Sequence, residues 1–94
     1  MVQKRVKKNK IDIVRNPTTV KLLAKEIIIA SDAYVSKLME ENEYRELILH
    51  YATYHGKKLF AINGSINSTI QNRIGIKRCG LVELMLKGFQ MSFY

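Results

Sequence analysis

The sequence predicts an α+β fold that is mainly α-helical, and three observations lead to this prediction. No glycine or proline occurs between residues 18 and 55, which favours helices there. All five glycines fall within residues 56–94, where turns and shorter elements are expected. Asn63-Gly64 lies between two apolar runs and is typical of the tight turn in a β-hairpin. We therefore expect two or three N-terminal helices, a β-hairpin near Asn63-Gly64 and a short C-terminal helix.

The first helix is predicted over residues 17–30. Asn16 is a favourable N-cap, and Pro17 loses no hydrogen bond at the first helical position. Its main apolar stripe has the spacing of one helix face and consists of Val20, Leu23, Ala24 and Ile27. Leu22 and Ile29 lie on the opposite side, so we expect burial on two faces.

Ser31-Asp32 offers a second cap, which predicts a second helix over residues 31–42. A break at Asn42-Glu43 would start a third helix that ends at Gly56, although residues 31–56 also suit one continuous helix. The apolar face of the last part consists of Tyr44, Leu47, Ile48, Tyr51 and His55.

The predicted hairpin pairs residues 59–62 with residues 65–70. In that register Ala61 faces Ile66 and Leu59 faces Ser68, so one side of the hairpin is apolar. The final helix is predicted over residues 81–87, with Gly88 as its stop.

A chain of 94 residues has the length of one domain, for which we take residues 11–94, preceded by a basic arm at residues 1–10. The longest apolar run is the four residues Ile27 to Ala30, too short to cross a bilayer. No apolar stretch follows the basic start, so we predict a cytoplasmic protein with no membrane partner.

The charge balance is the most informative feature for function. Sixteen Lys and Arg residues against eight Asp and Glu residues give a net charge of +8. Residues 1–10 contribute five bases and no acid, and residues 56–94 contribute six bases and one acid. Such a field attracts polyanions, and phosphate contacts give salt-sensitive affinity. We predict a non-enzymatic nucleic-acid-binding protein, with DNA as the expected partner, that acts as a homodimeric transcriptional regulator.

The candidate nucleic-acid contacts fall into three groups. Arm residues would follow the phosphate backbone, the bases near the hairpin would grip phosphates, and two amides would contact base edges. The arm group is Lys4, Arg5, Lys7 and Lys8; the phosphate group is Lys57, Lys58, Arg73, Lys77 and Arg78; the amides are Gln71 and Asn72.

Residues 64–74 also resemble the turn and recognition helix of helix-turn-helix proteins. A glycine turn precedes Ser68, which would cap a helix that exposes Gln71, Asn72 and Arg73. This resemblance implies a helix-turn-helix or, if the hairpin forms a wing, a winged-helix-like domain. The two interpretations compete for the same residues.

The first half of the chain resembles the ribbon-helix-helix family in outline. A short strand over residues 10–14 would precede the helices at 17–30 and 31–42. The resemblance implies that Lys10, Asp12 and Val14 face the major groove, where the aspartate departs from the charge that DNA requires.

The alternative function is a protein-interaction module or an inhibitor that acts on a larger acidic partner. The apolar C-terminus offers a contact surface, formed by Phe89, Met91, Phe93 and Tyr94. A third hypothesis is a small ribonuclease, because Arg45 and His50 resemble the catalytic pair of HEPN-type ribonucleases. At about 100° per residue, however, these two side chains lie about 140° apart around a helix.

No cofactor and no metal site are expected. His50 and His55 are five residues apart, which is the wrong spacing for two ligands on one helix face. Tyr44, Tyr51 and Tyr54 are expected in the core before any role in stacking on bases. Cys79 lies next to Arg78, which would lower its pKa if the thiol were exposed, but a buried thiol is the simpler expectation.

Overall fold

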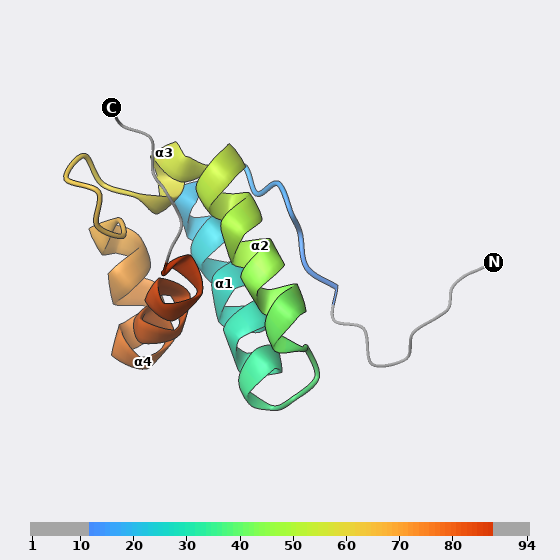
Figure 1. Cartoon of the computed structure of the whole chain (residues 1–94). Coiled ribbons are helices and arrows are strands. Elements are labelled where there is room, and N and C mark those ends of the chain that lie inside the picture. The colour runs from blue at the N-terminus through green and yellow to red at the C-terminus, as the bar shows by residue number, and fades with distance from the viewer. Residues whose placement is uncertain (1–11, 88–94) are drawn as a thin grey trace.

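The computed structural model describes residues 12–87 and contains four helices in that part of the chain. They are α1 (Val20–Val35), α2 (Glu41–Tyr54), α3 (Gly56–Leu59) and α4 (Ser68–Leu86). Helix α1 packs against all three of the others (Figure 1). The mainly helical prediction is therefore confirmed.

Helix α1 begins later and ends later than predicted. Its N-cap is Thr19, whose hydroxyl accepts a hydrogen bond from the Leu22 N–H (3.1 Å), so the predicted cap Asn16 lies outside the helix. The helix continues through residues 31–32, because Ser31 is buried and its hydroxyl bonds Tyr44 Oη (2.7 Å) instead of capping a new helix. The predicted boundary between the first two helices is therefore wrong.

A Schellman motif ends α1 and turns the chain into α2. The Leu38 N–H donates to the Ala33 carbonyl (2.8 Å), and the Lys37 N–H donates to the Tyr34 carbonyl (3.1 Å). Lys37 takes the left-handed conformation (φ 68°), a position that glycine usually occupies. Helix α2 then starts with a capping box in which the Glu43 carboxylate accepts a hydrogen bond from the Glu40 N–H (3.0 Å).

The predicted β-hairpin is wrong. Residues 60–67 do form a tight turn, in which the Ala61 N–H donates to the Ser65 carbonyl (2.7 Å) and Gly64 has a φ of 90°. Only one isolated bridge, between Phe60 and Ile66, accompanies this turn, and the described residues contain no sheet. The predicted second strand does not form beyond Asn67, because the Asn67 side chain accepts a hydrogen bond from the Thr69 N–H (2.7 Å) and caps α4.

A helix does begin at Ser68, as the helix-turn-helix interpretation predicted, but the rest of that motif and the wing are not found in the described residues. The turn of a helix-turn-helix has three or four residues, whereas residues 60–67 separate a four-residue α3 from α4. Without paired strands there is no wing in the described part of the chain.

Helix α4 is two helices joined at a kink. Gly75 has φ 88° and ψ 166°, a conformation that only glycine adopts readily. The predicted helix at residues 81–87 belongs to the second half, which turns back beside the first half in Figure 1.

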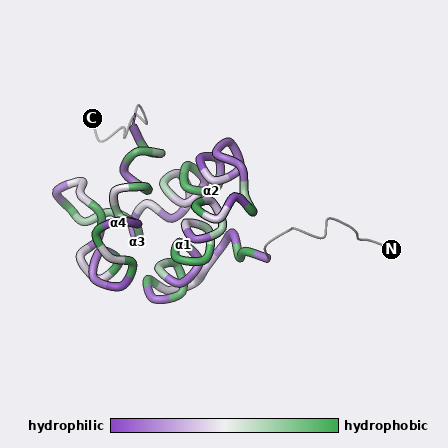
Figure 2. The backbone as a smooth tube through the Cα atoms, turned by 90° about the horizontal axis from the view of Figure 1, so that it is seen from below, coloured by the Kyte–Doolittle hydropathy of each residue, from purple (hydrophilic) through white to green (hydrophobic). Residues whose placement is uncertain are grey.

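The core lies between α1, α2 and the two halves of α4. Hydrophobic and hydrophilic residues alternate along each long helix, as expected where one face is buried (Figure 2). Tyr44 is fully buried and stacks on Tyr34, and burial raises the pKa of Tyr44 to about 12. Most positions of the predicted apolar stripes are buried, but Val20, Ile29 and His55 are only half-buried and Leu22 is 43% exposed, so the second buried face expected for the first helix is not found. The largest fully buried side chains are Tyr44, Tyr51, Leu23, Ile27, Ile48, Leu59, Ile70, Ile74 and Met85.

The segment before α1 has no strand within residues 12–19, so the ribbon-helix-helix outline is not found there; Lys10 lies outside the described residues. Side chains of α1 and α2 hold this segment instead. The Val14 N–H donates to Glu26 Oε1 (3.0 Å), and Tyr51 Oη donates to the Val14 carbonyl (2.6 Å). Among the described helices, none has the length and apolar character needed to span a membrane.

Candidate functional site

Within residues 12–87, lysines gather at one end of the α1–α2 pair and four acidic residues at the other, with Glu26 on α1 beside Lys25. Helices α1 and α2 are antiparallel and are joined by a short turn, so the start of α1 lies beside the end of α2 and α3 (Figure 1). Lys21 and Lys25 therefore lie at the same end as Lys57 and Lys58. Around the opposite turn lie four of the eight acidic residues, Glu40, Glu41, Glu43 and Glu46.

No Asp or Glu occurs from residue 47 to residue 82, so α3 and the first half of α4 bring no negative charge to this end. We call Lys21, Lys25, Lys57, Lys58 and Arg73 the basic end. Within residues 12–87, no ion pair neutralises any of these five side chains.

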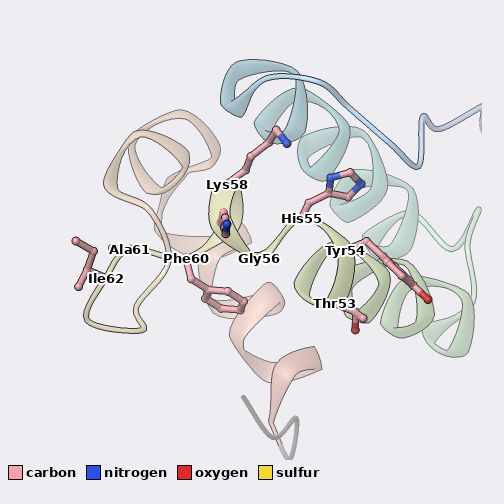
Figure 3. A pocket seen from close by; sticks show the side chains of 9 residues that line it. Thr53, Tyr54, His55, Gly56, Lys58, Phe60, Ala61 and Ile62 are labelled. Carbon is pink, nitrogen blue, oxygen red and sulfur yellow. The ribbon is translucent and has the colours of Figure 1, made fainter. Parts of the chain in front are cut away.

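An open hollow of about 600 Å³ lies beside α3 (Figure 3). Its lining residues come from the end of α2, from α3 and from the following loop: Thr53, Tyr54, His55, Gly56, Lys57, Lys58, Phe60, Ala61 and Ile62. Tyr54 is 71% exposed and Ile62 is fully exposed, which leaves large apolar surfaces uncovered next to two lysines.

A groove of about 540 Å³ lies between α1 and α4, and it contains Arg73. Its apolar floor includes Leu22, Ile28 and Ile29. Lys21 and Lys25, which are one helical turn apart on α1, line the same groove. The structure thus brings the predicted Arg73 together with two lysines that the sequence interpretation did not select.

Two predicted contact residues are engaged in structural bonds. Arg78 forms a bidentate pair with Asp32 (Nε–Oδ1 2.9 Å, Nη2–Oδ2 3.0 Å), and its Nη1 donates to the Ile74 carbonyl (3.0 Å). The hydrogen bond to Asp32 raises the pKa of Arg78. Gln71 Nε2 donates to the Ile66 carbonyl (2.7 Å), so this amide is not free to pair with a base edge.

The remaining predicted contact residues either lie on α3 and α4 or fall outside the described residues. Asn72 and Lys77 are exposed on α4, and Lys57 and Lys58 lie on α3. The arm residues Lys4, Arg5, Lys7 and Lys8 lie outside the described residues, and so do Phe89, Met91, Phe93 and Tyr94.

The two histidines hold the segment that leads into α1. His50 Nε2 donates to the Arg15 carbonyl (2.9 Å), and His55 Nε2 donates to Asn16 Oδ1 (3.0 Å). Burial, Lys58 and His50 lower the pKa of His55. Arg45 bonds Glu41 (2.8 Å) and not the same groups as His50, so the two residues have separate structural roles.

Cys79 is not an activated thiol. It is half-buried, its Sγ lies 3.9 Å from Glu83 Oε2, and both burial and Glu83 raise its pKa. Over residues 12–87, no group of three or more His, Cys, Asp or Glu residues is arranged to hold a metal ion.

Sequence reasoning missed Lys21, Lys25 and Phe60. The signal for the lysines was their spacing of four residues beside the apolar stripe; the adjacent acid, Glu26, is buried and accepts a hydrogen bond from the Val14 N–H. Phe60 had no signal, because it was assigned to a strand.

The fold and these two hollows define a small helical protein with one basic end. The chain belongs to a family described as conserved hypothetical protein, whose model matches residues 14–87. No curated protein and no solved structure matches the chain.

Proposed function

We propose that this protein binds nucleic acid without catalysing a reaction, with DNA as the expected partner, and that the basic end makes the phosphate contacts. The observation that carries the proposal is the gathering of five cations from three helices where no carboxylate of residues 12–87 forms an ion pair with them. Lysine and arginine side chains that are free of ion pairs release the counterions of phosphates when they bind.

The arrangement of the charges favours this function over a role of the lysines and arginines in solubility alone. Charges that serve only solubility need no order, whereas here the acids around residues 40–46 lie at the far end of the α1–α2 pair. A positive end opposite a negative end also orients the molecule as it approaches a polyanion. A role as a transcriptional regulator in the cytoplasm is part of the same proposal.

The test is a salt series on matched double variants. Lys57→Gln/Lys58→Gln removes two cations from the basic end, and Lys37→Gln/Arg45→Gln removes two from the acidic end. Binding is measured by fluorescence anisotropy with labelled DNA. Each lost phosphate contact removes about 0.9 from the slope of log affinity against log salt on a duplex. We expect the first pair to lower that slope by up to about 2 and the second pair to leave it nearly unchanged.

Two results contradict the proposal. One is the absence of affinity for single-stranded and duplex nucleic acid at low salt. The other is an equal loss of affinity in both double variants, because net charge alone would then explain binding.

The groove between α1 and α4 favours a second candidate, an acidic protein partner. Phosphates need no apolar floor, whereas an amphipathic helix with carboxylates would use both the floor and the three cations. Leu22→Gln keeps every charge but makes the exposed floor polar. If the partner is an acidic protein, this variant weakens its binding; if the partner is nucleic acid, the affinity stays unchanged.

A further inference from the structure

We infer that the hollow beside α3 binds an unpaired nucleobase stacked on the Phe60 ring, so that the preferred ligand is single-stranded nucleic acid. The inference rests on the proposed function and adds the class of nucleic acid. Its starting point is the lining of the hollow, which combines aromatic and aliphatic side chains with two lysines.

The lining matches the two parts of a nucleotide. Phe60, Ala61 and Ile62 form an apolar wall, and Lys57 and Lys58 carry the positive charge. A phosphate by itself would gain nothing from the apolar wall, and an apolar peptide would gain nothing from the lysines. A nucleotide has a flat base with π-faces and a charged phosphate, and aromatic rings beside cationic side chains are the common means of binding single strands.

The Phe60 ring is held in place before any ligand arrives. Its backbone N–H donates to the Gly56 carbonyl (2.8 Å), and its residue bridges to Ile66 across the tight turn. The side chain is half-buried and packs against the core cluster. Figure 3 shows the ring under α3, pointing toward the end of α2 where Thr53 lies. A fixed ring loses little conformational entropy when a base stacks on it.

Tyr54 supplies a second aromatic surface at the rim. It extends from the end of α2 away from Phe60 (Figure 3), and its ring lies 5.0 Å from the His50 ring with the planes tilted by 46°. With 71% of the residue exposed, Tyr54 is available to a neighbouring base of the same strand.

The pairing state of the ligand follows from this geometry. In a duplex the faces of the bases are stacked on each other, and only their edges are accessible in the grooves. Stacking on Phe60 therefore requires a base that is already unpaired or that is extracted from the helix at the cost of its pairing and stacking. Single strands avoid that cost.

The experiment compares a labelled oligothymidylate of about 12 nucleotides with a duplex of the same length, by fluorescence anisotropy at low salt. The key variant is Phe60→Leu, which keeps apolar bulk for the core but has no flat face. Tyr54→Ala is a second variant at an exposed position, and Val35→Ala, which is 64% exposed at the end of α1, is the control.

We expect the wild-type protein to prefer the single strand. Phe60→Leu should weaken single-strand binding by roughly 5- to 150-fold and Tyr54→Ala by a smaller factor, since one stacked base contributes about 1–3 kcal/mol. Both should leave duplex affinity within about twofold, and Val35→Ala should change neither. Thermal unfolding by circular dichroism checks that each variant folds, and Tyr54→Ala decides the question if Phe60→Leu does not fold.

The outcomes separate this inference from the proposed function. Equal affinity for both ligands, with no effect of either aromatic variant, would overturn the stacking site and leave nucleic-acid binding intact. No binding to either ligand would overturn the proposed function itself.

Discussion

At the scale of single residues, the neighbours of a cation decide whether it is available to a ligand. Arg78 and Lys57 were equal candidates in the sequence, where both lie in the basic C-terminal part. In the structure Arg78 is bound to Asp32 and to the Ile74 carbonyl, whereas no ion pair within the described residues holds Lys57. The partner Asp32 is 46 residues away, which sequence spacing does not indicate.

This difference gives a prediction for Arg78→Gln. The variant should lower the free energy of unfolding by at most about 1 kcal/mol, because both partners are partly exposed. Its affinity for nucleic acid should stay within about twofold of wild type, since the lost charge was already neutralised. Urea denaturation and anisotropy check the two parts. A loss of affinity as large as that of Lys57→Gln would return Arg78 to the binding surface.

The lowered pKa of His55 predicts that stability falls in mild acid. The folded protein holds the pKa of His55 below its usual value of about 6.5, so below that pH the unfolded chain takes up the proton first. The free energy of unfolding should therefore decrease as the pH falls from about 6.5 toward the folded pKa and change no further below it. His55→Gln should flatten this dependence in urea titrations at pH 7.5 and 5.5 (about 1 unit to either side of the usual pKa). An unchanged slope would assign the effect to another group.

At the scale of helices, Gly75 divides α4 into two helices, and Gly80 in the second of them provides a control. No atom lies within 4 Å of a Cβ added at either position, so any difference between their alanine variants comes from backbone conformation. Gly75→Ala should cost about 1–3 kcal/mol, because its positive φ with extended ψ suits only glycine. Gly80→Ala should stabilise by about 0.5–1 kcal/mol. Urea denaturation measures both, and equal effects would contradict a role for the kink.

Helix boundaries show how far the sequence predicts this fold. Apolar spacing identified the buried faces of α1 and α2, because burial requires that period. The end of α1 was missed since Lys37, not glycine, takes the left-handed position of its Schellman motif. The predicted hairpin was wrong because Asn67 caps α4. The chain therefore enters a helix at Ser68, the residue that was expected to pair with Leu59 in the second strand. The tight turn was thus recognised from the sequence, but the structure of the chain that follows the turn was not.

At the scale of the whole molecule, the charged residues are grouped differently in the folded structure than along the sequence. Along the chain a nearly neutral middle separates two basic ends, of which residues 1–10 lie outside the described residues. Folding instead brings Lys21 and Lys25, from the middle of that pattern, to the end that holds Lys57 and Lys58. The sequence therefore predicted a positively charged surface, but it identified only some of the residues that form the basic end.

The homodimer stays a prediction at this scale. We expect light scattering after gel filtration to give twice the chain mass of 10.9 kDa. If residues 89–94 provide the contact, their deletion should give the monomer mass; an unchanged dimer would assign self-association to the remaining residues 1–88 and leave the C-terminus for another partner. A monomeric full chain would contradict the prediction.

The central position of α1 has a consequence for synthesis on the ribosome. Its apolar stripe of Leu23, Ala24 and Ile27 is covered by α4 in the folded protein. Helix α4 ends at Leu86, about 60 residues later in the chain. Until translation reaches that point, a nascent chain can assemble only the local α1–α2 hairpin, with part of this stripe open to water. Chaperones that shield apolar segments would meet this protein during that interval, and premature termination before α4 would leave a product prone to aggregate.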